Sequence, residues 1–173
     1  MSNHEAPVKV YITWDKYFDL LRQLIGKIQA AGFQPKQIVC IARGGLIPGD
    51  ILSRVLKAPL AVISVASYPD GQTRQEKIVF SRDLTSARPL RRESILLVDD
   101  LTESGETLEK TWHWLCEWYG LDPTEVKTAT LWHKSWSKFA PDFYAEFVDL
   151  DPQTGTRPWI EQPQELFSES LEP

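Results

Sequence analysis

The order of apolar and polar residues along the chain predicts helices that alternate with strands. A first helix is indicated by apolar residues spaced along one face and by a glycine at its end: Tyr17, Leu20, Leu21, Leu24, Ile28 and Gly32. Two further helices are expected, one at 48–56 with a proline in its first turn and one at 107–119 closed by Gly120. Apolar runs predict the strands: 38–42, 60–65, 77–80, 95–98, 126–132 and 143–148.

Strands that alternate with helices are typical of an α/β fold, in which helices flank both faces of a parallel sheet. A chain of 173 residues fits a single domain, which we expect to span 1–173. The alternation covers a core at about 10–132. It then gives way to a segment with prolines and tryptophan, predicted to form a small C-terminal hood at 133–167 with a polar tail at 168–173. The polar segment 68–75 is predicted to be a mobile loop.

Composition narrows the functional classes. The net charge of −5 argues against a general nucleic-acid binder, because such proteins gather Lys and Arg against phosphates. No apolar run reaches membrane-spanning length and the first residues lack the apolar core of a signal peptide, so we expect a cytoplasmic protein without a membrane partner. Cys40 and Cys116 are predicted to be buried thiols, and the histidines lack metal-ligand spacing.

Two adjacent carboxylates, Asp99 and Asp100, follow the predicted strand 95–98, and a loop of hydroxyl residues and glycine leads from them into the helix at 107. Ligands of α/β proteins bind at such carboxyl ends of strands. The free amides of the loop and helix terminus favour a phosphate, while the carboxylates suit sugar hydroxyls or Mg²⁺. The motif therefore predicts a phosphorylated sugar as ligand. Its simpler interpretation is an acidic turn that caps the helix.

A second loop, Arg43-Gly44-Gly45, lies between the strand 38–42 and the helix 48–56. Paired glycines allow successive amides to point one way around an anion, and the arginine adds a positive charge. Alone, this loop is better explained as a tight turn with an exposed arginine. Two anion-suited loops at neighbouring strand ends, however, predict a sugar that carries two separate phosphate groups.

The residues 95–107 resemble the phosphoribosyl diphosphate motif of the type I phosphoribosyltransferases, and Arg43-Gly44-Gly45 resembles their diphosphate loop. The resemblance covers about 38–165. It is closest to the bacterial xanthine-guanine branch, through Ser67-Tyr68, Arg74, Lys134 and the string 159–163. It implies a Rossmann-like phosphoribosyltransferase fold and Mg²⁺-dependent transfer of phosphoribosyl from phosphoribosyl diphosphate (PRPP) to a 6-oxopurine. It also implies a homodimer or homotetramer.

The resemblance further implies the role of each site residue. Asp99 and Asp100 would bind the ribose hydroxyls and help to position Mg²⁺. Lys134 would donate to the purine 6-oxygen, Trp159 would stack on the ring and the backbone of Ile160 would contact position 2. The phosphate groups would be held by the following residues: Arg43, Gly44, Gly45, Arg74, Thr102, Ser104, Gly105, Glu106 and Thr107. Without the resemblance, Lys134 and Arg74 would be taken as surface cations and Trp159 as ordinary packing.

Glu103 departs from the family pattern, which usually has aspartate at this position. The family residue faces purine N7 and assists proton movement, so Glu103 is a candidate catalytic residue alongside Asp99 and Asp100. Its extra methylene changes the reach of the carboxylate, and a proton-transfer group must lie within hydrogen-bond distance. The preferred base and the acid-base role of Glu103 are therefore open.

Two other functions are compatible with these residues. One is a phosphoribosyltransferase that acts on another base, such as a pyrimidine. The other is a regulatory protein that senses PRPP without turnover, although the negative charge and the lack of a preceding helix-turn-helix speak against it. The aromatic residues Trp112, Trp114 and Trp118 invite a subunit interface.

Overall fold

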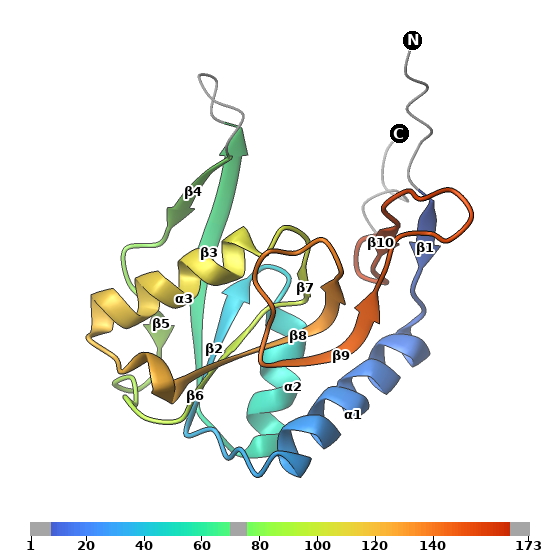
Figure 1. The fold of residues 1–173 in the computed structure, drawn as a ribbon. Coiled ribbons are helices and arrows are strands. Elements are labelled where there is room, and N and C mark those ends of the chain that lie inside the picture. The colour runs from blue at the N-terminus through green and yellow to red at the C-terminus, as the bar shows by residue number, and fades with distance from the viewer. Residues whose placement is uncertain (1–7, 70–75, 167–173) are drawn as a thin grey trace.

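The computed structural model describes residues 8–69 and 76–166. Within them the chain forms an eight-stranded sheet of order β4-β3-β2-β6-β8-β7, with β5 beside β3 and β9 beside β8, and a separate two-stranded sheet of β1 and β10 (Figure 1). The elements are β1 (Lys9–Tyr11), α1 (Trp14–Ala30), β2 (Gln37–Ala42), α2 (Leu46–Leu56), β3 (Leu60–Pro69), β4 (Glu76–Phe80), β5 (Thr85–Ser86), β6 (Ile95–Val98), β7 (Leu101–Thr102), α3 (Glu106–Tyr119), η1 (Pro123–Glu125), β8 (Val126–Lys134), β9 (Phe143–Val148) and β10 (Trp159–Glu161).

The main sheet is mostly parallel, as the alternating pattern predicts. β2 pairs in parallel with β3 and β6, and β8 pairs in parallel with β6 and β9. β4 and β5 are antiparallel to β3. Helices provide the crossovers between β2 and β3 and between β6 and β8, whereas the parallel neighbours β8 and β9 are joined by the segment 135–142, which contains no helix. β4 follows β3 directly and runs antiparallel to it. The α/β fold class is thus confirmed, with an antiparallel edge in addition.

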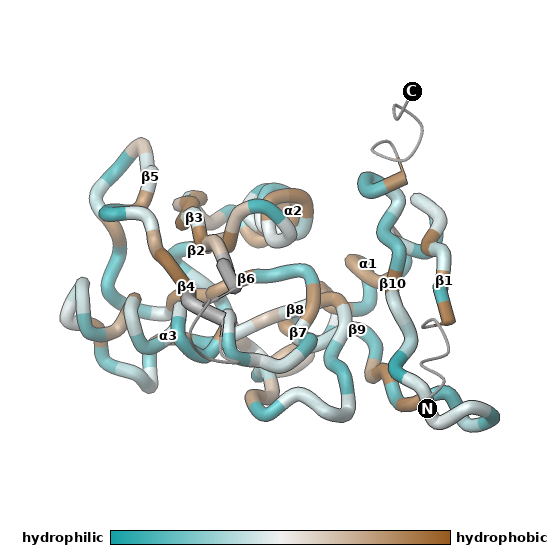
Figure 2. The backbone as a smooth tube through the Cα atoms, turned by 90° about the horizontal axis from the view of Figure 1, so that it is seen from above, coloured by the Kyte–Doolittle hydropathy of each residue, from teal (hydrophilic) through white to brown (hydrophobic). Residues whose placement is uncertain are grey.

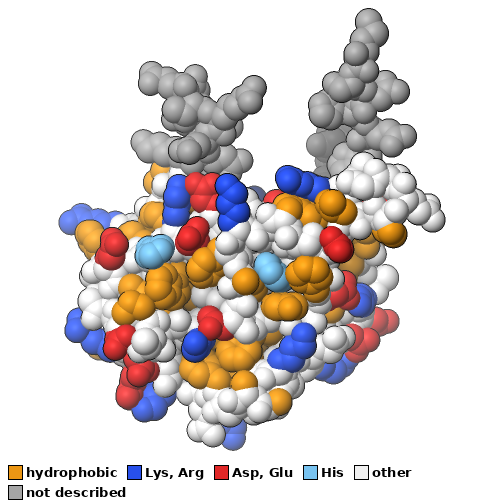
Figure 3. All heavy atoms as spheres, in the orientation of Figure 1, with side chains coloured by type: hydrophobic (Ala, Val, Ile, Leu, Met, Phe, Trp, Pro, Cys, Tyr) orange, Lys and Arg blue, Asp and Glu red, His pale blue; other side chains and the backbone are white. Residues whose placement is uncertain are grey.

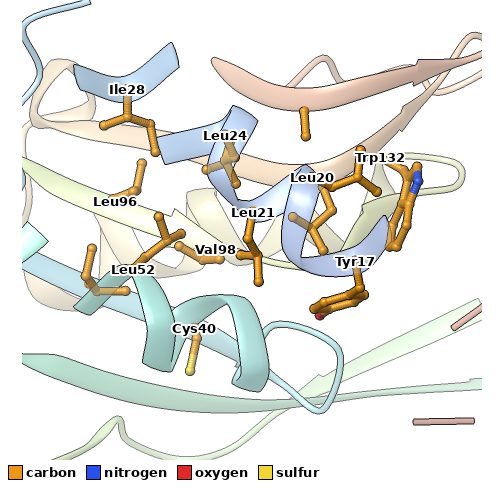
Figure 4. Close-up of a cluster of buried hydrophobic side chains, with 14 of the residues drawn as sticks. Tyr17, Leu20, Leu21, Leu24, Ile28, Cys40, Leu52, Leu96, Val98 and Trp132 are labelled. Atoms are coloured by element: carbon orange, nitrogen blue, oxygen red, sulfur yellow. The ribbon is translucent and has the colours of Figure 1, made fainter. Parts of the chain in front are cut away.

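The parallel strands are buried on both faces because α1 and α2 cover one face and α3 covers the other (Figure 2). Successive side chains of β2 alternate between the two cores, so that Ile38 and Cys40 meet the α1 side while Val39 and Ile41 meet the α3 side. The apolar face of α1, from Tyr17 to Ile28, points into the first core toward β6 and α2 (Figure 4).

The residues at the helix ends are types that commonly begin or end helices. Thr13 precedes α1 and its hydroxyl accepts from the Lys16 amide at 3.2 Å. α3 ends at Tyr119 and is capped by Gly120, which has a left-handed φ of 60°, as the sequence predicts. α2 begins at Leu46, so that Pro48 lies in its first turn, where a missing amide hydrogen is tolerated.

The hood joins residues from both ends of the described chain. β1 pairs in parallel with β10; the Trp159 amide donates to the Val8 carbonyl at 2.9 Å, and the Ile12 amide donates to the Glu161 carbonyl at 2.9 Å. Lys9 forms an ion pair with Glu161 at 3.3 Å. Within the predicted hood at 133–167, the end of β8 and the strand β9 belong to the main sheet, and only β10 pairs with the N-terminal strand β1. The name hood is used below for β1 and residues 157–166. The predicted polar tail at 168–173 lies outside the described residues.

The two cysteines are buried, whereas several apolar side chains lie at the surface. Cys40 and Cys116 are free and buried, as predicted. Apolar side chains form several patches over α3 and near β9, broken by charged groups (Figure 3). On α3, Trp118 is 59% exposed and stacks on Trp114 at 6.0 Å between ring centroids. None of the helices in residues 8–69 and 76–166 is both long and apolar enough to span a bilayer.

Candidate functional site

The carboxyl ends of β2, β6 and β8 meet at one edge of the sheet beneath the hood. A cavity of about 290 Å³ opens there, and its walls come from the Asp99–Leu108 segment, the end of β8 and the hood. A second hollow of about 700 Å³ adjoins it on the side of Arg43 and Gly44. The two share Asp100, Trp159 and Glu165 in their walls. Most of the predicted phosphate, sugar and base residues therefore lie in the walls of these two adjoining hollows.

The paired glycines allow the Arg43 loop to lie directly against the acidic pair. A Cβ at Gly44 would collide with the carboxyl group of Asp100, and a Cβ at Gly45 would collide with the carbonyl oxygens of Val98 and Ile41. Only a residue without a side chain permits this approach. The Ala42–Arg43 peptide is cis, and the Arg43 side chain is exposed at the edge of the second hollow.

Asp99 is buried although its side chain is a carboxylate. Burial, with the neighbouring charge of Asp100 adding to it, raises the pKa of Asp99 well above the ordinary value. The Asp100 amide donates to Asp99 at 2.9 Å and opposes that shift. A group held this way is disfavoured as an anion unless a hydroxyl or cation from a ligand compensates it, which is typical of a functional site.

Asp100 is more accessible and is fixed from two directions. The Leu101 amide donates to its Oδ1 at 2.7 Å, and the side chain of Gln162 donates to its Oδ2. Gln162 is buried in the hood, so it links the hood to the acidic pair. The sequence includes Gln162 in the family-like string 159–163 but predicts no role for it, because no local pattern indicates a contact with Asp100.

The loop after the acidic pair is the one predicted to bind a phosphate. Ser104, Gly105 and Thr107 line the cavity, and Gly105 has φ 83° at the N-terminus of α3. A Cβ at Gly105 would collide with Ser137 and Phe139. The first amides of a helix lack partners within the helix and point outward, where they suit an anion. The Glu106 amide donates to Ser104 Oγ at 3.3 Å, but the N-cap residue of α3 is Gly105, which has no side chain to cap the helix.

Two predicted phosphate residues have side chains that are engaged elsewhere. The hydroxyl of Thr102 shares a hydrogen bond with His133 Nδ1 at 2.9 Å, and burial lowers the pKa of that histidine. The carboxylate of Glu106 pairs with Lys110 one turn along α3, and Glu106 is not part of the cavity wall. We therefore expect these two residues to serve a phosphate through their backbone.

On the base side, Lys134 is buried rather than at the surface, with 2% of its side chain exposed. Its ammonium donates to the carboxylate of Glu103 and to the Pro158 carbonyl at 3.3 Å. An ammonium has three protons, so one remains for an acceptor in the cavity. Trp136, for which the sequence suggested no role, donates its indole N–H to the other oxygen of Glu103 at 2.9 Å.

The hood presents Trp159 and Ile160 to the same cavity. Trp159 is 50% exposed and lines both hollows, so its ring is not consumed by core packing. The Trp159 amide and the Glu161 carbonyl face β1. In a parallel ladder alternate residues bond to opposite sides, so the amide and carbonyl of Ile160 point away from β1. The amide and carbonyl of Ile160 make no hydrogen bond to β1 and can therefore bind a ligand.

A metal held by protein groups alone does not fit the described residues, which contain no cluster of three or more His, Cys, Asp or Glu placed to bind one. Mg²⁺ bound together with a phosphorylated substrate needs only one or two carboxylates, and Asp99 and Asp100 are the residues that could supply them. Arg74, the remaining predicted residue, lies outside the described residues.

A phosphoribosyl transferase family model and several phosphoribosyltransferases match this chain. The family model for the phosphoribosyl transferase domain matches residues 12–167. The xanthine-guanine phosphoribosyltransferase of Vibrio vulnificus (strain YJ016) is 32% identical over 95% of this chain and 94% of its own. A purine phosphoribosyltransferase structure from Pyrococcus horikoshii Ot3 has a TM-score of 0.72 and 33% identity over 91% of this chain and 93% of its own.

A xanthine-guanine-hypoxanthine phosphoribosyltransferase from Helicobacter pylori shares the fold, with a TM-score of 0.74 at 22% identity over 94% of this chain and 97% of its own. The family model spans most of the chain and the first two relatives match nearly all of it. Most motif residues of the resemblance line two adjoining hollows. This chain belongs to the phosphoribosyltransferase family.

Proposed function

We propose that this chain is a purine-salvage enzyme that transfers the 5-phosphoribosyl group from PRPP to a 6-oxopurine. The products are the nucleoside 5-monophosphate and pyrophosphate. The observation that carries the proposal is the presence of two adjoining hollows in which an acidic pair separates a glycine-arginine loop from a helix N-terminus, with a buried lysine and an exposed indole close by. Two relatives of at least 32% identity are named as purine or xanthine-guanine phosphoribosyltransferases.

The two loops suggest an orientation for the phosphorylated sugar. Its 5-phosphate would lie on the loop at Ser104–Thr107, where the amides of α3 begin, and its diphosphate would lie beside Arg43 and Gly44 in the second hollow. The ribose hydroxyls would then meet Asp99 and Asp100 between the two phosphate positions. Contact with those hydroxyls would compensate the burial of Asp99.

The base would occupy the cavity between the acidic pair and the hood. The remaining proton of Lys134 suits a 6-oxygen, because a carbonyl accepts, whereas the 6-amino group of adenine donates. The ring of Trp159 offers a stacking face worth about 1–3 kcal/mol per base. The backbone of Ile160 presents one donor and one acceptor, which match the position-2 edge of a purine.

The reaction replaces one bond to ribose C1 with another. The bond from C1 to the diphosphate oxygen breaks with its electron pair, positive charge grows on the sugar ring, and a base nitrogen bonds to C1. Asp99 and Asp100 hold the ribose as this charge develops, and Arg43 faces the leaving diphosphate. The base loses a proton as it bonds, and the contact of Glu103 with Lys134 supports Glu103 as the candidate acceptor of that proton.

Mg²⁺ is the cofactor that this donor set fits. When bound with PRPP it would neutralise charge on the diphosphate that leaves. Asp99 and Asp100 are the residues that would help to hold it, together with oxygens of the substrate. The homo-oligomer and the cytoplasmic location expected from the sequence stay predictions.

A base panel tests the proposal. Purified protein is incubated with PRPP and Mg²⁺ and with hypoxanthine, guanine, xanthine, adenine, uracil or orotate, and pyrophosphate release is measured. We expect turnover on at least one 6-oxopurine and little on adenine. Preference for a pyrimidine would move the chain to another phosphoribosyltransferase class. Absence of turnover on every base, with specific nucleic-acid binding in a gel shift at moderate salt, would identify a regulatory protein.

A further inference from the structure

Trp136 lies in the turn that follows β8, two residues after Lys134. Its indole N–H donates to Glu103 Oε1 at 2.9 Å, while Lys134 donates to Glu103 Oε2. The cavity wall includes Glu103 and Lys134 but not Trp136. The indole therefore reaches the Glu103 carboxylate from outside the cavity and leaves the ligand volume free.

The indole is itself held by two cations. The Lys134 ammonium lies 5.3 Å from the ring centroid of Trp136, and the Arg157 guanidinium also lies 5.3 Å from it. Both distances are within the range of cation–π attraction. The carbonyl of Pro158, the residue after Arg157, accepts from Lys134 at 3.3 Å, so this part of the hood also contacts the Lys134 ammonium. Trp136 thus has partners on β8, in the hood and in the loop that carries Glu103.

Glu103 needs such support because its side chain is long and half exposed. It has 48% of its side-chain surface in contact with solvent. A glutamate has one more rotatable bond than the aspartate usual in this family, and each free torsion lowers the population of any single geometry. Donors on both oxygens define the plane of the carboxylate. An indole N–H is well suited to this, since it is a donor only and has no charge to lose.

We propose that Trp136 is a positioning residue that holds the Glu103 carboxylate at the base site during phosphoribosyl transfer. The inference rests on the proposed function and adds a residue to it. Lys134 donates to Glu103 and to Pro158 and has its third proton for the incoming base, so it serves several partners at once. The Trp136 bond is independent of the base, so Glu103 keeps its place when a proton has to be accepted.

Trp136→Phe tests this role because phenylalanine keeps an aromatic ring and removes the N–H. Loss of one hydrogen bond to a charged group should lower kcat on the preferred base by about 10-fold, while KM for PRPP stays within about twofold. Trp118→Phe is the matched control, since that tryptophan is exposed on α3 and absent from the walls of the site. We expect it to match the unaltered protein in both constants.

A double mutant separates positioning from general structural support. In a Glu103→Ala background, Trp136→Phe should change kcat by less than about twofold, because no carboxylate remains to be held. A further loss of about 10-fold there would assign Trp136 a structural role and overturn the proposal. Unchanged kcat in the single Trp136→Phe variant would overturn it as well.

Arg157→Met is a second variant for the case in which Trp136→Phe does not fold. Arg157 is exposed, and its loss removes one cation beside the indole without touching the N–H. We expect kcat to fall about two- to fivefold. An unchanged kcat would then count against the proposal. If the unaltered protein shows no turnover on any base, the proposed function fails and this inference fails with it, whereas turnover that is insensitive to position 136 removes the inference alone.

Discussion

Replacement of Lys134 by methionine is the sharpest test of the base site. The lysine side chain is 2% exposed, and methionine is an unbranched chain of similar length that can fill the same space. The substitution removes the ammonium that donates to Glu103 and to the Pro158 carbonyl. Packing is largely kept, so the effect reports on the charge and its hydrogen bonds.

The expected cost in stability is modest. Glu103 is 48% exposed, so its carboxylate remains hydrated after the ammonium is lost. The Pro158 carbonyl loses one donor. We expect the free energy of unfolding to fall by about 1–2 kcal/mol, less than the roughly 3–5 kcal/mol of a fully buried pair that loses one partner.

The expected cost in activity is larger and specific to the base. Loss of a charged donor to the 6-oxygen removes about 1.5–3 kcal/mol, which is roughly a 10- to 150-fold fall in kcat/KM for hypoxanthine or guanine. KM for PRPP should stay nearly constant, because Lys134 lies on the base side of the acidic pair. Pyrophosphate release at varied base and varied PRPP measures both constants, and urea unfolding measures stability.

Lys127→Met is the matched control. Lys127 lies on the same strand β8, but its side chain is 43% exposed and pairs with Asp142 at 3.0 Å. Exposed pairs contribute about 0.2–1 kcal/mol, so we expect a small stability change and unaltered kinetics. Retention of kcat/KM for hypoxanthine in Lys134→Met would refute the role of Lys134 as the base donor. A parallel rise of KM for PRPP would show that the substitution disturbs the whole site.

Three further substitutions test the acidic pair and the glycine loop. Asp100→Asn should nearly abolish pyrophosphate release and leave the circular dichroism spectrum unchanged, and turnover like that of the unaltered protein would remove the acidic pair from the mechanism. Because the pKa of Asp99 is higher in the folded protein than the ordinary 3.8, the protonated carboxyl contributes to folding stability at pH below 3.8. That contribution is lost as pH rises through the raised pKa. Asp99→Asn should therefore be more stable than the unaltered protein at neutral pH in urea titrations, with the gain shrinking toward pH 3.8; a gain that is constant with pH would contradict this. Gly44→Ala places a methyl group against the Asp100 carboxyl, so KM for PRPP should rise at least about tenfold, and an unchanged KM would show that the loop can shift freely.

Much of the core could be predicted because its elements are long enough to show a pattern. α1 repeats apolar residues along one face, β2 contains the apolar run 38–42 followed by Arg43-Gly44-Gly45, and β6 is an apolar run followed by Asp99. Each pattern reflects burial on one side or on both. β1 and β10 have 3 residues each and remained unpredicted, since so few positions cannot show a period.

The residues of the candidate site also fall into those that the sequence predicts and those that it does not. Asp99, Asp100 and the Arg43-Gly44-Gly45 loop were found because each is a compact motif directly after a buried strand. Trp136 and Gln162 were missed as functional residues because their importance comes from partners far along the chain. Trp136 contacts a residue 33 positions away, and Gln162 one 62 positions away.

The amino-acid order is enough to establish an α/β domain with two anion-suited loops and an acidic pair at neighbouring strand ends. Those features depend on short-range spacing and on the rule that parallel strands end at one edge. Tertiary structure decides that β1 crosses to the hood to support Trp159, and that Gln162 reaches Asp100. It also decides that Lys134 is buried against Glu103. A buried cation is stable only beside its partners, and which groups become partners is set by how distant segments pack.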